Sequence, residues 1–328
     1  MENILENEEQ IVEDAIIDVE PKIDYVLQTD KLVKKYNGKK ALNKCSMNVQ
    51  KGDIYGFVGE NGSGKTTIIR AITGLIHPES GSFKLFGVKN TSNEIYEVRK
   101  RIGAIVETPS IYRNMTAKAN LKMQATILGI EIGDKKIIST LEVVGLADLF
   151  NDKKKAKNFS LGMRQRLGIA MALLSDPELL ILDEPMNGLD PAGIVEIREL
   201  ILTLNKQKNI TFIISSHILS ELSLIATKYG IISKGTIIQE ISAAELKNQC
   251  KKAILINTNN KNEAYDSLKD SVLENELYIT STGIRVEGNH NINDIVKILI
   301  DKNIPIEAIN TREFNFEDYY LSLLGGGK

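Results

Sequence analysis

The sequence lacks an apolar run long enough to cross a membrane as a helix, which takes about 20 consecutive apolar residues. Its most apolar stretch, residues 211–226, is interrupted by serine, histidine and glutamate. The first twenty residues are acidic and lack the positive start that is typical of a secretory signal peptide. We therefore expect a cytoplasmic protein that reaches a membrane only through a partner.

Cysteine is scarce, and neither charge dominates. Cys45 and Cys250 lie far apart without the spacing of a metal site, and two isolated cysteines make no disulfide framework. They are typical of small side chains in a reducing compartment. Basic and acidic residues nearly cancel, 41 against 43, so the basic excess of nucleic-acid-binding proteins is missing. The sequence predicts no nucleic-acid partner.

The 328 residues divide into three segments. Residues 1–24 form an acidic tail, which we expect to be flexible with a short helix over 11–17. Residues 25–244 alternate apolar strands with helices, which predicts an α/β core with a mainly parallel sheet and a helical subdomain at about 108–175. Residues 245–328 predict strand, helix, two short strands, helix, strand and helix, as in a small α+β accessory domain of ferredoxin-like type.

Individual elements of the core can be predicted from their patterns. Two strand-like runs flank Asn37-Gly38 and predict a hairpin. A helix is expected over 93–101, a strand over 102–107 and a further helix over 193–205. In the accessory domain the last strand is expected over 305–310.

Residues 59–66, Gly-Glu-Asn-Gly-Ser-Gly-Lys-Thr, match the phosphate-binding pattern G-x-x-x-x-G-K-[ST]. The loop follows an apolar strand and opens a helix, which a chance glycine-rich turn would not do. Its backbone N–H groups and the helix N-terminus then face a polyphosphate, Lys65 reaches the β- and γ-phosphates, and the Thr66 hydroxyl can bind Mg²⁺. The candidate ATP-binding residues are Gly59, Asn61, Gly62, Ser63, Gly64, Lys65, Thr66 and Thr67.

Two acids close the buried strand at residues 179–182. Asp183 stands where such a strand delivers a carboxylate to Mg²⁺. Glu184 points differently, because side chains alternate along a strand, and is placed to act as general base toward the attacking water. Alone, the pair fits two solvated acids equally well. Together with the phosphate-binding loop, it predicts a nucleotide hydrolase.

Residues 158–170, Asn-Phe-Ser-Leu-Gly-Met-Arg-Gln-Arg-Leu-Gly-Ile-Ala, resemble the signature of the ABC (ATP-binding cassette) ATPase family, which is usually Leu-Ser-Gly-Gly-Gln. Ser160 and Gly162 keep the key positions, whereas Leu161 and Met163 depart from the common pattern. The resemblance covers roughly residues 26–240 and implies the P-loop ATPase fold of that family.

Three further positions are similar to family motifs. Asp190, in Asn-Gly-Leu-Asp-Pro, falls in the D-loop, which lies at a dimer interface in the family. His217, after an apolar strand, falls at the switch histidine, which contacts the γ-phosphate. Tyr36 falls where an aromatic ring often stacks on adenine, although a tyrosine between strands is more often plain packing.

The resemblance also implies a head-to-tail dimer that encloses two ATP molecules. Ser160 and Gly162 of one subunit would cap the γ-phosphate that Lys65 of the other subunit holds, because a helix N-terminus with a serine makes a second anion site. The partner would be a second copy of the chain or a close homologue. ATP and Mg²⁺ are the expected cofactors.

Glu107 stands where most ABC ATPases have a glutamine that touches Mg²⁺ and senses the membrane partner. Glutamate keeps an oxygen ligand, so metal contact is still expected. This glutamate and the segment after it resemble bacitracin-resistance and lantibiotic-immunity exporters. Ile111, Tyr112 and Met115 in that segment would either dock a transmembrane chain or pack internally.

The resemblance implies an ATP-hydrolysing subunit of an ABC transporter that sits on the inner face of the membrane against separate permease chains. Its cargo would be an antimicrobial peptide of the lantibiotic or bacitracin type. The alternative is a soluble ABC ATPase acting on ribosomes, although those usually carry two cassettes in one chain. A DNA-repair ATPase would need a long coiled coil before the signature, and a kinase or GTPase would lack the signature.

Overall fold

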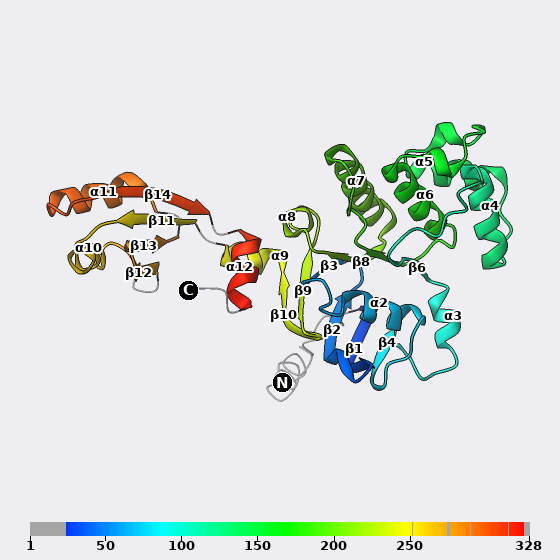
Figure 1. Cartoon of the computed structure of the whole chain (residues 1–328), viewed down its shortest axis with the longest axis horizontal. Helices are drawn as coiled ribbons and strands as arrows, with labels where there is room; N and C mark the ends of the chain where they lie inside the picture. The colour runs from blue at the N-terminus through cyan, green and yellow to red at the C-terminus, as the bar shows by residue number, and fades with distance from the viewer. Residues whose placement is uncertain (1–23, 251, 274–275, 289, 314, 325–328) are drawn as a thin grey trace, which may run out of the picture.

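The computed structural model describes residues 24–250, 252–273, 276–288, 290–313 and 315–324. The predicted acidic tail and its short helix lie outside these residues, apart from the final residue of the tail. In the described part of the chain, no helix combines the length and the apolar character needed to span a membrane. Figure 1 shows a larger body that holds two sheets and a smaller unit built on a third.

The body is organised around a six-stranded sheet with the order β10-β9-β3-β8-β7-β6. β9, β3, β8, β7 and β6 run parallel, and only the edge strand β10 is antiparallel to its neighbour. The predicted mainly parallel sheet is therefore confirmed. The strands are β3 (Ile54–Val58), β6 (Ile102–Ile105), β7 (Leu179–Asp183), β8 (Thr211–Ser216), β9 (Lys228–Ser233) and β10 (Thr236–Ser242).

Alternate side chains of the central strands enter different hydrophobic clusters. In β3, Tyr55 and Phe57 join the cluster that includes α2 (Lys65–Thr73), while Ile54 and Val58 join the cluster on the other face. Both clusters are buried because helices or a second sheet cover each face, as is usual for parallel sheets. The apolar central strands are therefore buried on both faces of the sheet.

A smaller antiparallel sheet covers part of one face. Its order is β2-β1-β4-β5, with β1 (Tyr25–Tyr36), β2 (Lys39–Gln50), β4 (Ser80–Leu85) and β5 (Val88–Lys89). The predicted hairpin is present: Asn37 and Gly38 have φ of +49° and +79°, the positive values that a two-residue hairpin turn requires.

Helices between β5 and β8 form a further part of the body. They are α3 (Ile95–Arg99), α4 (Ala117–Leu128), α5 (Asp134–Val143), α6 (Leu161–Leu173) and α7 (Pro191–Lys208), with 3₁₀ turns at Ala147–Leu149 and Ala156–Asn158. Figure 1 shows α4, α5 and α6 gathered at one end.

Several predicted boundaries were wrong. The helix expected over 93–101 covers five residues, and no side chain caps its start. The strand expected over 102–107 ends at Ile105, because Glu107 has φ +64°, which a strand cannot accommodate. α7 starts two residues earlier than 193, because Asp190 caps it and proline suits its first position.

Two short helices complete the body: α8 (Leu219–Leu222) lies between β8 and β9, and α9 (Ala243–Gln249) follows β10. The third sheet, β12-β13-β11-β14, comes after α9 and is antiparallel throughout. The predicted order of elements is present, although the last strand starts after residue 305, a proline without an N–H to donate. These elements are β11 (Lys252–Asn257), α10 (Lys261–Leu268), β12 (Leu277–Ile279), β13 (Gly283–Glu287), α11 (Ile292–Asp301), β14 (Ala308–Glu313) and α12 (Phe316–Leu323).

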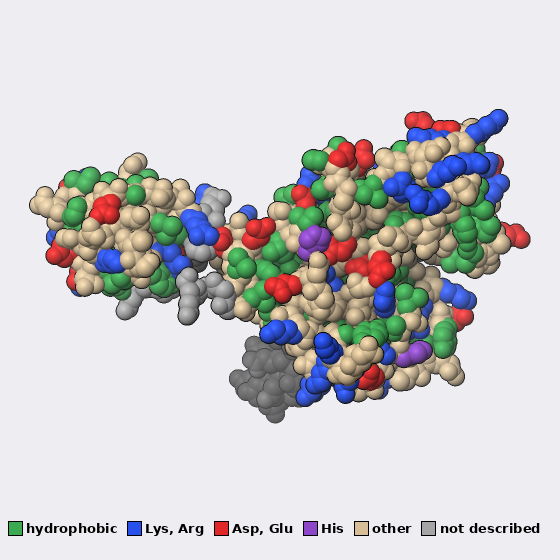
Figure 2. Space-filling model, in the orientation of Figure 1, with side chains coloured by type: hydrophobic (Ala, Val, Ile, Leu, Met, Phe, Trp, Pro, Cys, Tyr) green, Lys and Arg blue, Asp and Glu red, His purple; other side chains and the backbone are tan. Residues whose placement is uncertain are grey.

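The third sheet and α10 and α11 enclose a hydrophobic cluster of their own. Figure 2 shows this unit as a lobe joined to the body by a narrower section. We call it the accessory unit, defined as residues 252–313. The predicted domain boundaries themselves stay a prediction.

Candidate active site

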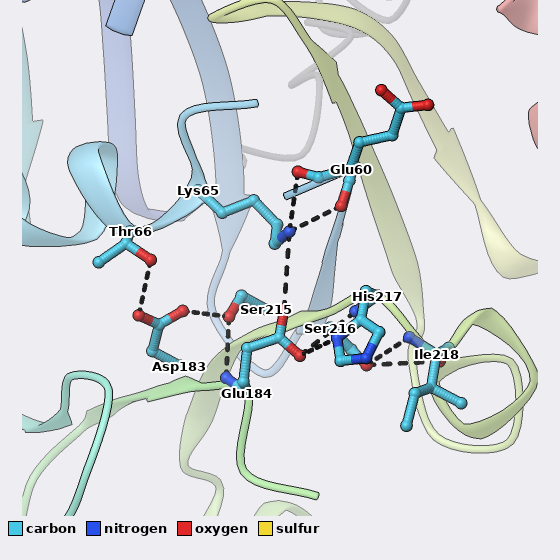
Figure 3. Close-up of polar contacts among 10 residues, drawn as sticks. Glu60, Lys65, Thr66, Asp183, Glu184, Ser215, Ser216, His217 and Ile218 are labelled. Carbon is cyan, nitrogen blue, oxygen red and sulfur yellow. Dashed lines mark hydrogen bonds and ion pairs between the residues drawn. The ribbon is translucent and has the colours of Figure 1, made fainter. Parts of the chain in front are cut away.

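The candidate site lies at the carboxyl ends of three neighbouring strands. β3 pairs with β8 and β8 pairs with β7, all in parallel, so the segments that follow these strands meet at one edge of the sheet. The phosphate-binding loop follows β3, the two acids close β7, and His217 follows β8. Figure 3 shows side chains from these three segments turned toward one another.

The phosphate-binding loop depends on its glycines. Gly62 and Gly64 have φ of +80° and +114°, which other residues rarely adopt. A Cβ at Gly59 would lie 2.5 Å from the carbonyl oxygen of Ile232 in β9. Asn61 and Gly62 are exposed at the rim of the loop, while Ser63 is buried. The backbone is thus held in a tight curve that opens into α2.

Lys65 is the buried cation of the site. Its Nζ donates to the carbonyl oxygens of Gly59 at 2.6 Å and Glu60 at 3.3 Å, and it lies 3.6 Å from Oε1 of Glu184. The side chain is only 6% exposed, so the amine is available to groups inside the loop rather than to bulk water. A buried ammonium beside free loop amides is suited to binding phosphate oxygens.

Asp183 connects the loop to β7 and β8. The Thr66 hydroxyl donates to Oδ2 of Asp183 at 2.9 Å, and the Ser215 hydroxyl donates to Oδ1 at 2.5 Å. A hydroxyl and a buried carboxylate at contact distance are hard oxygen donors of the kind that Mg²⁺ takes from proteins. Thr67 follows Thr66 on α2 and is half-buried.

Sequence reasoning missed Ser215. Besides donating to Asp183, its Oγ accepts the backbone N–H of Glu184 at 2.9 Å, so one hydroxyl holds both acids. Ser215 is wholly buried in β8. The available signal was a polar pair, Ser215-Ser216, that closes an otherwise apolar strand just before His217.

Glu184 and His217 form a pair at the mouth of the site. Nδ1 of His217 lies 2.6 Å from Oε2 of Glu184, and the His217 backbone N–H faces the same oxygen at 3.4 Å. Glu184 has φ +51°, a positive value that turns its side chain out of the strand direction. The carboxylate therefore lies between Lys65 and His217, where it can accept a proton from a water held beside a phosphate.

Ser160, Gly162 and Asp190 make up a second group. Ser160 caps α6 by accepting the N–H of Met163 at 3.1 Å, and Asp190 caps α7 by accepting the N–H of Gly193 at 3.1 Å. A Cβ placed on Gly162 would have one neighbour within 4 Å outside its own helix, the side chain of Leu189 at 3.9 Å. The space beside Gly162 is therefore open.

The signature lies beside the D-loop, because Gly162 of the signature faces Leu189, the residue before Asp190. The polar partners found for Ser160 and Asp190 lie within their own helices and do not include the phosphate-binding loop. The structure thus separates the predicted site residues into one group around Lys65 and another around Ser160.

Glu107 and Tyr36 stand apart from both groups. Oε1 of Glu107 lies 2.5 Å from the guanidinium of Arg70 on α2, and among the described residues its polar partner is Arg70 rather than Thr66 or Asp183. Tyr36 ends β1 with 44% of its surface exposed. Their roles toward Mg²⁺ and adenine stay predictions.

The three apolar residues after Glu107 were expected either to dock a transmembrane chain or to pack internally, and they differ in burial. Ile111 packs against the main hydrophobic cluster, whereas Tyr112 is 42% exposed. Met115 is half-buried. Internal packing therefore accounts for Ile111, and Tyr112 is free to meet a partner.

The site is of the ATP-binding cassette class, and comparison with known proteins supports this. The ABC transporter family profile matches residues 42–187. The bacitracin transport ATP-binding protein BcrA of Bacillus licheniformis is 42% identical over 304 residues, which cover 92% of this chain and 98% of BcrA. The lantibiotic transport ATP-binding protein SrtF of Streptococcus pyogenes is 44% identical over 215 residues, which cover 66% of this chain and 90% of SrtF.

Solved structures agree on the fold. cbiO1 from Clostridium perfringens, part of the ABC transporter complex cbiONQ, superposes with a TM-score of 0.61 at 28% identity, covering 68% of this chain and 90% of cbiO1. The chain therefore belongs to the family of ABC transporter ATP-binding proteins. It is the ATP-binding, ATP-hydrolysing subunit of a transporter, and the ribosomal alternative is not favoured.

Proposed function

We propose that two copies of this chain, or the chain and a close homologue, bind two molecules of Mg²⁺-ATP head to tail and so drive a separate membrane permease. The observation that carries the proposal is the separation of Lys65 from Ser160. Each subunit has a candidate anion site at the phosphate-binding loop and another at the start of α6, and among the described residues no hydrogen bond or ion pair joins Lys65 to Ser160. A head-to-tail pair joins the two around one ATP.

Lys65 binds the β- and γ-phosphates by giving up its carbonyl partners in the loop. Thr66 and Asp183 would hold Mg²⁺, which would neutralise charge on the phosphates. Glu107, which pairs with Arg70, would be the third ligand.

Glu184 accepts the proton of the attacking water, and His217 orients this carboxylate and contacts the γ-phosphate. Ser160 and Gly162 of the partner subunit cap the same phosphate from the opposite side. Asp190 lies at the interface, and Tyr36 stacks on adenine.

The permease docks at the end of the body that carries α3 and α4. A hollow of about 760 Å³ lies between these helices and α5, and the exposed apolar side chains of Tyr96 and Leu128 line it. A second hollow of about 390 Å³ adjoins it under residues 106–110 and includes Ile127, which is 60% exposed. An amphipathic segment from a cytoplasmic loop of the permease fits such a surface.

The cargo is proposed from the relatives. BcrA is named for bacitracin transport and SrtF for lantibiotic transport, and the segment from Glu107 onward resembles such exporters. We infer that the transporter exports an antimicrobial peptide of this type for immunity or resistance, with this chain on the inner face of the membrane. The experiment below also distinguishes this transporter from a soluble ATPase that acts on ribosomes.

Tagged Glu184→Gln protein is trapped with ATP in its native cells, and the proteins that co-purify are identified. We expect a multi-span membrane protein, absent when Lys65→Ala is combined with Glu184→Gln because that variant cannot hold ATP. Cells that lack the chain should become sensitive to bacitracin or a lantibiotic. Ribosomal proteins without a membrane chain would overturn the transport proposal.

A further inference from the structure

The last helix, α12, returns from the accessory unit to the ATP-binding body. Asn315 starts it with a capping box, in which its side chain accepts the N–H of Asp318 and the Asp318 carboxylate accepts the N–H of Asn315. Phe316 and Tyr320, four residues apart on one helix face, are both buried. They belong to the main hydrophobic cluster of the body rather than to that of the accessory unit.

α12 stands over elements that lead into the ATP site. The ring of Phe316 lies 4.6 Å from the ring of Tyr229 in β9, and β9 is the neighbour of β3, which ends at the phosphate-binding loop. α12 also contacts α8, the short helix that follows His217. Figure 1 shows α12 beside α9, with the accessory unit on one side and the body on the other.

Tyr320 reaches the phosphate-binding loop itself. It lines a hollow of about 230 Å³ with Gly59, Glu60, Asn61 and His217. Burial raises the pKa of Tyr320 most strongly, the nearby charge of Glu60 raises it further, and the Glu60 backbone N–H opposes the rise. The carbonyl of the same Glu60 accepts Nζ of Lys65 at 3.3 Å, a contact drawn in Figure 3. Tyr320 thus lies beside the stretch of loop whose carbonyl oxygens accept the amine of Lys65.

We propose that Tyr320 is a positioning residue for ATP, through which α12 holds residues 59–61 of the loop and links the accessory unit to nucleotide binding. The proposal rests on the ATP site assigned above. A loop that is already held loses less freedom when its ligand binds, so the contact strengthens ATP binding. Since coupling is reciprocal, bound ATP should in turn stabilise the docked position of α12.

The test compares Tyr320→Phe with Tyr319→Phe. Both variants lose one hydroxyl from α12, but Tyr319 faces Glu245 and Cys250 instead of the loop. For Tyr320→Phe we expect the Kd of ATP and the KM for hydrolysis to rise about two- to tenfold, the effect of one hydrogen bond, with kcat little changed. Tyr319→Phe should keep the wild-type KM, and the two variants should have similar melting temperatures.

Amide hydrogen exchange of α12 supplies a readout that does not depend on turnover. ATP should slow exchange at residues 316–323 in the wild type and much less in Tyr320→Ala. If Tyr320→Phe keeps the wild-type KM and Kd while Lys65→Ala loses ATP binding, the role proposed for Tyr320 is overturned and the ATP-site assignment stands. Normal ATP binding by Lys65→Ala would overturn the site assignment and this inference with it.

Discussion

Oε2 of Glu184 lies 2.6 Å from Nδ1 of His217, although the two residues follow different strands of the central sheet, β7 and β8. The same carboxylate faces Lys65 at 3.6 Å through its other oxygen. A carboxylate between a cation that binds phosphate and an imidazole is placed to take a proton from water at the γ-phosphate.

Glu184→Gln should bind ATP with near wild-type affinity but lose roughly 100- to 10,000-fold in kcat, because an amide cannot accept the proton. Steady-state phosphate release and a fluorescent ATP analogue measure the two properties separately. Glu178→Gln is a suitable control, since Glu178 pairs with Arg101 away from the site. Normal turnover by Glu184→Gln would sink the general-base assignment.

Ser215→Ala should lower the free energy of unfolding by about 1–3 kcal/mol, because the buried Asp183 loses a donor and the Glu184 N–H keeps only the Ser215 backbone carbonyl as acceptor. It should also lower kcat more than ATP affinity, since the acids and not the loop lose their support. Ser216→Ala is the matched control on the same strand, as its hydroxyl accepts the N–H of Ile218 instead. Equal turnover in the two variants would contradict this role of Ser215.

Thr66→Ala should raise the Mg²⁺ concentration that gives half-maximal hydrolysis, because it removes one of the three side chains proposed to hold the metal. Thr66→Ser should restore the wild-type requirement. Thr73→Ala should leave it unchanged, since the Thr73 hydroxyl donates to the Ile69 carbonyl within α2. A titration of hydrolysis against Mg²⁺ distinguishes these outcomes, and identical curves for all three variants would refute the assignment.

Gly230→Ala should destabilise the protein by about 1–3 kcal/mol through overpacking. A Cβ at Gly230 would lie 2.0 Å from the hydroxyl of Tyr55, which is fully buried and donates to Glu240 at 2.8 Å. Gly133→Ser adds a Cβ where nothing lies within 4 Å, at the N-cap of α5, and should be tolerated. Urea unfolding of the two variants gives the comparison, and equal stabilities would show that Tyr55 can move aside.

The phosphate-binding loop, the acid pair and the alternation of strands with helices each leave a local pattern in the sequence. A buried parallel strand is nearly all apolar, and a loop that wraps phosphate needs glycine at fixed positions. The early end of β6 was missed, because only the backbone angle of Glu107 in the folded chain shows it.

Contacts between distant segments left no such pattern. Ser215 bridges two acids that lie some thirty residues before it, Arg70 on α2 meets Glu107 in the segment after β6, and Tyr320 lines a hollow with Glu60, which is far from it in the sequence. Each depends on how elements pack in three dimensions, which periodicity does not encode. The sequence alone therefore indicated the segments that meet at the candidate site, but not the residues that support them.

The central claim is that ATP joins two subunits, and size-exclusion chromatography with light scattering tests it most directly. Glu184→Gln should be monomeric without nucleotide and dimeric with ATP. The double variant Ser160→Arg, Glu184→Gln should bind ATP equally well yet stay monomeric, because a large cation at the start of α6 blocks the partner's γ-phosphate site. Dimers of the double variant with ATP would contradict the head-to-tail arrangement.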